Sequence, residues 1–140
     1  MVVVAIIGLL VALALPPAIR SRIQSNESAA IGNLRTLSSA AESFRTTLNP
    51  PAYSPDLNTM IASIPPYLDA SWAANQRQGY NFAYAVAGDQ STYSVSATPQ
   101  IPNISGINSY CVDQTGILRR YAPGAATGDQ AGCGAAGTPI

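Results

Sequence analysis

The chain has 140 residues, of which 47% are hydrophobic and 10% are charged, and its seven Arg side chains balance seven acidic ones. This length suits one modest domain. A chain with no net charge and no Lys lacks the basic surface that neutralises nucleic-acid phosphates, so no nucleic-acid partner is predicted. Low charge with many Ala, Ser, Gly and Tyr residues suits a surface that neighbouring molecules of the same kind cover. The alternative is an ordinary secreted domain of low charge.

An apolar segment occupies residues 1–19, and the first charged side chain is Arg20. As a helix it would span about 28 Å, close to the thickness of a bilayer core. We therefore expect a helix of transmembrane length here. Gly8, Pro16 and Pro17 are predicted to break or loosen it, because glycine is flexible and proline lacks a backbone N–H.

A second helical pattern covers residues 20–48. Its apolar residues recur at steps of three and four, with a gap at Asn26 and Glu27, and Pro50-Pro51 ends it. The stripe comprises Ile19, Ile23, Ala30, Leu34, Leu37, Ala41, Phe44 and Leu48. This pattern predicts an amphipathic helix that continues into a head. The stripe needs a cover, and packing on the chain's own head supplies at least part of it.

Residues 49–79 form a predicted connecting region with one short helix, for which Ser54 is the expected N-cap and Pro55 the first residue. From residue 80 the apolar period changes to two. The segments "YNFAYAV" and "TYSVSAT" predict one hairpin, and "NSYCV" and "ILRRY" predict a second. The whole predicts an α+β fold, in which a long N-terminal helix packs on a small antiparallel sheet within residues 80–140.

Cys111 and Cys133 are the only two cysteines of a chain that has no His, so they cannot form a four-ligand zinc site. Behind an apolar leading segment they indicate one disulfide in an oxidising compartment, and two free thiols are the alternative. The seven acidic residues are scattered, and those in turns, Asp89 and Asp113, are expected to bond their own backbone. No catalytic, cofactor or metal site is predicted, and hence no enzyme.

The stretch "MVVVAIIGLLVALALP" closely resembles the N-terminal helix of type IV pilins and of type II secretion pseudopilins. In that family a basic leader and Phe-Thr-Leu-Ile-Glu-Leu precede Met-Val-Val-Val-Ala-Ile-Ile-Gly, and a proline follows. Met1 to Gly8 and Pro16 match this run and its spacing. The leader, its cleavage site and the glutamate are absent before Met1, so we expect an N-terminally truncated sequence.

The resemblance implies a filament subunit with a pilin-like fold. It implies an inner-membrane stage, a prepilin peptidase, a pilus assembly machine and a homo-oligomeric helical filament, outside the cell or as a periplasmic pseudopilus. Gly8 to Pro16 matches the stretch that can melt in such filaments. A major pilin is favoured; the alternatives are a pseudopilin and a signal-anchored periplasmic binding domain. The expected filament-core side chains are Met1, Val2, Val3, Val4, Ile6, Ile7, Leu9, Leu10, Val11, Leu13 and Leu15.

Overall fold

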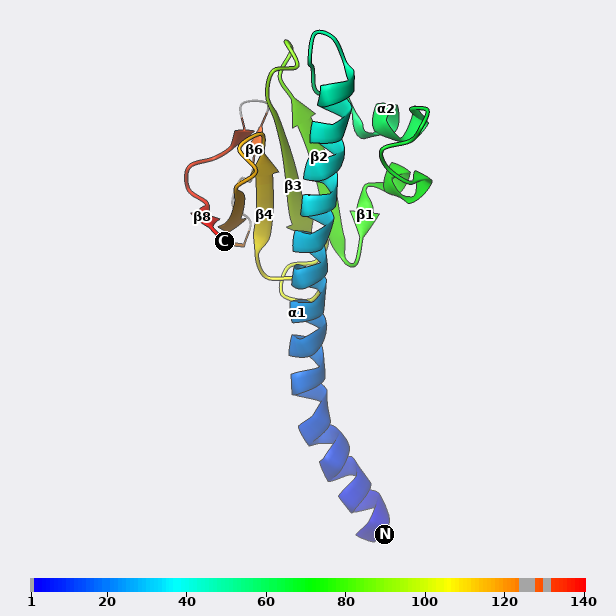
Figure 1. Cartoon of the computed structure of the whole chain (residues 1–140). Coiled ribbons are helices and arrows are strands. Elements are labelled where there is room, and N and C mark those ends of the chain that lie inside the picture. The colour runs from blue at the N-terminus through cyan, green and yellow to red at the C-terminus, as the bar shows by residue number, and fades with distance from the viewer. Residues whose placement is uncertain (1, 124–127, 130–131) are drawn as a thin grey trace.

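The computed structural model describes residues 2–123, 128–129 and 132–140, apart from the side chains of residues 10–17, 128 and 129. A long helix, α1 (Val2–Thr47), lies with its C-terminal half on an antiparallel sheet, and its N-terminal half extends beyond that sheet (Figure 1). The predicted α+β fold is confirmed. We call residues 49–140 the head.

Helix α1 is continuous from Val2 to Thr47 and passes through Gly8, Pro16 and Pro17. The expected break at these residues is therefore absent from the isolated chain. A proline removes one N–H donor and crowds one carbonyl, and a helix accommodates this by bending. Figure 1 shows the N-terminal part of α1 bending away from the axis of the remainder. Loosening of this stretch within a filament stays a prediction.

The apolar stripe of α1 faces the sheet, as predicted. Its buried members include Ala30, Leu34, Leu37, Ala41 and Phe44. The residues at its two ends, Ile19 and Leu48, are exposed. The first buried side chain of the described part of α1 is Ile23, so the head covers the helix only from that level onward.

The connecting region carries helix α2 (Leu57–Ala62) and a 3-10 helix, η1 (Ala70–Ala74). The predicted N-cap of α2 was wrong by two residues: Asp56 is the cap, and its carboxylate accepts the N–H of Thr59 at 2.6 Å. Ser54 is buried instead and donates its hydroxyl to the Asp56 carbonyl. An extended aspartate next to the first turn reaches the free N–H groups directly, which makes it the better acceptor.

The main sheet has six antiparallel strands in the order β1-β2-β3-β4-β5-β8. Both predicted hairpins are confirmed, as β2 (Tyr80–Val86) with β3 (Tyr93–Pro99), and β4 (Ser109–Asp113) with β5 (Leu118–Tyr121). Two very short strands extend its edges, β1 (Gln76–Arg77) and β8 (Thr138–Pro139). The core lies between this sheet and α1, where Val95 of β3 pairs with Val112 of β4.

The outer face of the sheet is covered as well. A third hairpin, β6 (Gly128–Asp129) with β7 (Gly132–Cys133), packs against β3 and β4. Directly paired residues share a face of a sheet, and the pairs Ser94–Asp113 and Ser96–Cys111 form the outward face here. All four are buried, which explains why β3 and β4 lack the simple alternation of a half-exposed sheet.

Candidate assembly surface and the disulfide-linked C-terminal region

The N-terminal part of α1 presents large apolar side chains that the described part of the chain leaves largely exposed. From Val2 to Leu9 every residue is exposed, and the large side chains are between 52% (Ile6) and 74% (Val2) exposed. Soluble monomers rarely leave so continuous an apolar surface in water, and such a surface marks contact with protein or membrane. The described part of this segment is therefore the candidate assembly surface.

The predicted filament-core residues divide into two groups. Val2, Val3, Val4, Ile6, Ile7 and Leu9 lie on this exposed segment, as does Gly8, where an added Cβ would meet nothing. Met1 lies outside the described residues, and so do the side chains of Leu10, Val11, Leu13, Leu15, Pro16 and Pro17. Judged on the residues described, none of the helices is sufficiently long and apolar to cross a membrane.

The polar gap in the stripe of α1 holds a loop of the head. Glu27 Oε1 accepts the backbone N–H of Ile107 at 2.9 Å and that of Asn108 at 3.0 Å. It also accepts the Asn108 side-chain amide at 3.2 Å, and Asn26 Nδ2 donates to the Ser105 carbonyl at 2.8 Å. The sequence shows this gap but not its partners, which lie about eighty residues away.

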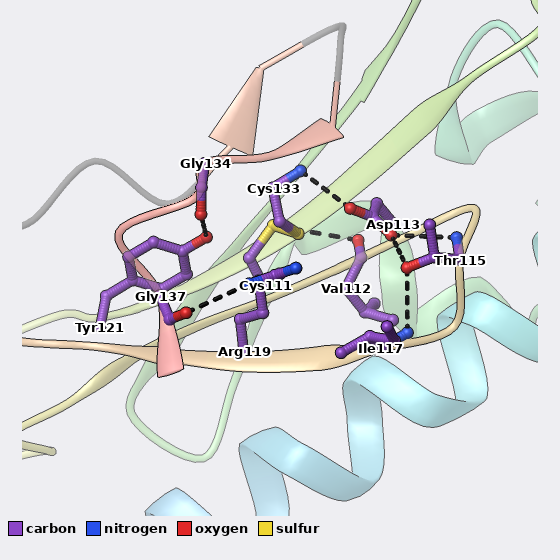
Figure 2. Close-up of a disulfide and its surroundings, with 10 residues drawn as sticks. All are labelled: Cys111, Val112, Asp113, Thr115, Ile117, Arg119, Tyr121, Cys133, Gly134 and Gly137. Carbon is purple, nitrogen blue, oxygen red and sulfur yellow. Dashed lines mark hydrogen bonds between the residues drawn. A yellow bond between two sulfur atoms is a disulfide. The ribbon is translucent and has the colours of Figure 1, made fainter. Parts of the chain in front are cut away.

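The predicted disulfide between Cys111 and Cys133 is present (Figure 2). It ties β7 to the outward face of β4, and Cys111 is fully buried beneath the contact. Two further bonds hold the segment after Cys133 to β5: Tyr121 Oη donates to the Gly134 carbonyl and Arg119 Nη1 donates to the Gly137 carbonyl. The C-terminal region is thus fixed by a covalent bond and by hydrogen bonds.

Asp113 combines a turn and a link beside the disulfide. Its Oδ1 accepts the N–H and the hydroxyl of Thr115, which confirms the predicted backbone bond in the turn, and its Oδ2 accepts the Cys133 N–H at 3.1 Å (Figure 2). Asp89 forms the same kind of turn with the Ser91 N–H. Burial opposes ionisation of Asp113, but the hydrogen bonds from Thr115 and Cys133 outweigh it and lower the pKa of this carboxyl.

Tyr53 of the head packs against two charged side chains of α1, Glu42 and Arg45. Tyr53 donates to Glu42 Oε1 at 2.7 Å and lies beneath Arg45, with 5.0 Å from the guanidinium carbon to the ring centroid. Burial, and then the bond to the Glu42 carboxylate, raise the pKa of Tyr53 to about 12. Among the residues described, no three His, Cys, Asp or Glu side chains are grouped to hold a metal ion.

These features define an α+β protein with a long, partly uncovered N-terminal helix, which is consistent with a pilin fold. In sequence the chain is similar to the type IV major pilin protein PilA of Myxococcus xanthus (strain DK1622), with 33% identity over 138 residues. The match covers 91% of this chain but only 58% of that relative's length. No protein-family model and no solved structure matches.

Proposed function

We propose that this chain is a structural subunit of a type IV pilus, a major pilin without enzymatic activity, that polymerises through the N-terminal half of α1. The observation that carries the proposal is the exposed apolar segment Val2–Leu9, continuous with a helix that a folded head holds rigidly. The relative's description as a type IV major pilin favours a pilus over a secretion pseudopilus. The expected location of the assembled subunit is an extracellular filament.

The energetics of the segment require a second environment. Covering one large aliphatic side chain is worth roughly 1.5–3 kcal/mol, so the six on Val2–Leu9 together disfavour exposure to water by about 10 kcal/mol or more. The inner membrane supplies the cover before assembly, and equivalent helices supply it in the filament. Transfer between these two apolar surroundings changes little apolar burial, so an assembly machine must supply the work of extraction.

The prepilin peptidase and the assembly machine are partners implied by the resemblance of residues 1–16 to pilins. Within the filament, Gly8, Pro16 and Pro17 are the proposed sites of helix loosening. A stretch that lacks one or more internal hydrogen bonds lengthens and bends at lower cost than an uninterrupted helix. The bend of α1 in Figure 1 agrees with that role.

A charge placed in the exposed segment tests the proposal. We expect Ile7→Glu to abolish filaments on cells that express the chain, because an unpaired carboxylate would enter an apolar core. The matched control is Thr46→Glu, an exposed position near the C-terminal end of the same helix. Normal filament yield from the Ile7→Glu variant would contradict polymerisation through this segment. Filaments that stay within the periplasm would assign the chain to a pseudopilus instead.

A further inference from the structure

The connection between β3 and β4 is an uncharged loop, residues 100–108, with three exposed isoleucines. Ile101, Ile104 and Ile107 are 54%, 63% and 41% exposed. We call residues 100–108 the isoleucine loop. It lies at the end of the sheet where α1 leaves the head (Figure 1). An exposed apolar cluster on a loop marks a contact surface rather than part of the core.

Most backbone N–H groups of the isoleucine loop are hydrogen-bonded within the protein. Acceptors from the loop, from Gly79 and from Glu27 receive the N–H groups of Gln100, Ile101, Asn103, Ile104, Ser105, Ile107 and Asn108. Pro102 has no N–H to satisfy. A segment whose N–H groups are mostly paired internally leaves water at lower cost than one whose N–H groups need water. The loop therefore has the property that an interfacial environment demands.

Along the axis of α1, the isoleucine loop lies close to the C-terminal end of the apolar residues 1–19. Ile23 is buried, so the head reaches down α1 to within three residues of Arg20, which is about 5 Å of helix rise. The two headgroup layers add roughly 5–7 Å on each side of a bilayer core. If residues 1–19 occupy the core, Arg20 and Arg22 lie at its boundary. The end of the head that carries the isoleucine loop then lies within the headgroup layer.

We propose that the isoleucine loop is a second membrane contact of the unassembled subunit, which rests its head on the lipid headgroup layer. The inference depends on the membrane stage in the proposed function. Two observations favour a lipid surface as the occupant. The loop lies at the end of the head from which the apolar residues 1–19 extend, and the exposed cations Arg20 and Arg22 lie between that segment and the head. Anionic lipid headgroups attract such cations, while the isoleucine side chains enter the acyl boundary.

Fluorescence quenching by brominated lipids tests this contact on the full chain. The chain is reconstituted at low density in vesicles of phosphatidylcholine and phosphatidylglycerol that carry bromine near the acyl carbonyls. We expect the added fluorescence of Ile104→Trp to be quenched at least twofold more than that of the control Ile64→Trp. Ile64 is 99% exposed and follows α2, which lies toward the opposite end of the sheet (Figure 1).

Trp72 is 1% exposed and supplies the same background in each variant. Ile101→Trp is a parallel probe, and circular dichroism verifies that each variant folds. Equal quenching of the loop and control variants, in vesicles that carry the chain, would overturn the lipid contact alone. Failure of the wild-type chain to float with the vesicles would instead overturn the membrane stage of the proposed function.

Discussion

Glu27 is expected to contribute substantially to the stability of the head, although it lies in the middle of a helix and is partly exposed. Its carboxylate accepts two backbone N–H groups and one side-chain amide of the isoleucine loop, at 2.9–3.2 Å. A hydrogen bond to a charged group contributes about 1.5–3 kcal/mol. Because water can reach part of this site, Glu27→Ala should lower the free energy of unfolding by about 2–3 kcal/mol in total. Glu27→Gln keeps one neutral acceptor and should cost roughly half as much.

Urea unfolding of the full chain in detergent measures this difference. Trp72 is the only tryptophan, is buried and packs edge-on against Phe82, so its emission reports unfolding of the head. Gln24→Ala, one turn earlier on α1 and exposed, controls for the helix-forming tendency of alanine. A loss below about 0.5 kcal/mol in Glu27→Ala, or equal losses for Ala and Gln, would refute the role of the carboxylate.

Three other perturbations follow from the same structure. Replacing Cys111 and Cys133 with Ala removes a covalent link across 22 residues and should lower the free energy of unfolding by about 3 kcal/mol in the loop-entropy model. Unfolding of the reduced wild type is the check. No loss would show that the C-terminal region is held without the disulfide. Leu37→Ala, at a fully buried position, should lower the free energy of unfolding in urea by about 3–4 kcal/mol. Leu48→Ala, at a position 40% exposed, should lower it by less than about 1 kcal/mol. Equal losses would contradict the assigned core. Burial raises the pKa values of Tyr53 and Tyr110 to about 12 from 10.0, so the stability from their neutral forms is complete below pH 10.0 and lost as pH rises toward 12. Absorbance at 295 nm checks this, and a titration in which all tyrosines of the folded head share a midpoint near pH 10 would contradict it.

Periodicity predicts the parts of this fold whose partners are close in the chain. The stripe from Ala30 to Phe44 repeats at helical spacing, and β2 and β3 alternate around a short turn, so local pattern locates them. Strands of two residues such as β1 and β8 carry no period, and they form only because an existing sheet edge offers hydrogen bonds. Such elements depend on tertiary context and escape sequence pattern.

The candidate site divides in the same way. Val2–Leu9 is evident from composition and from its resemblance to pilins, and the structure adds that its large side chains are uncovered. The sequence did not predict the role of Asn26 and Glu27, because a polar gap in an apolar stripe does not identify the residues that it contacts. The signal was the gap itself, since a helix that only packs on a core needs no carboxylate on its buried face. The displaced cap at Asp56 likewise depended on backbone conformation.

The central claim is that the N-terminal half of α1 joins copies of this chain into a filament. Helical reconstruction of native surface appendages tests it most directly. The account predicts filaments built from this polypeptide, with the segments that include Val2–Leu9 clustered around the axis and the heads outside. Appendages that lack the polypeptide, or a filament in which these segments lie apart from one another at the surface, would contradict it.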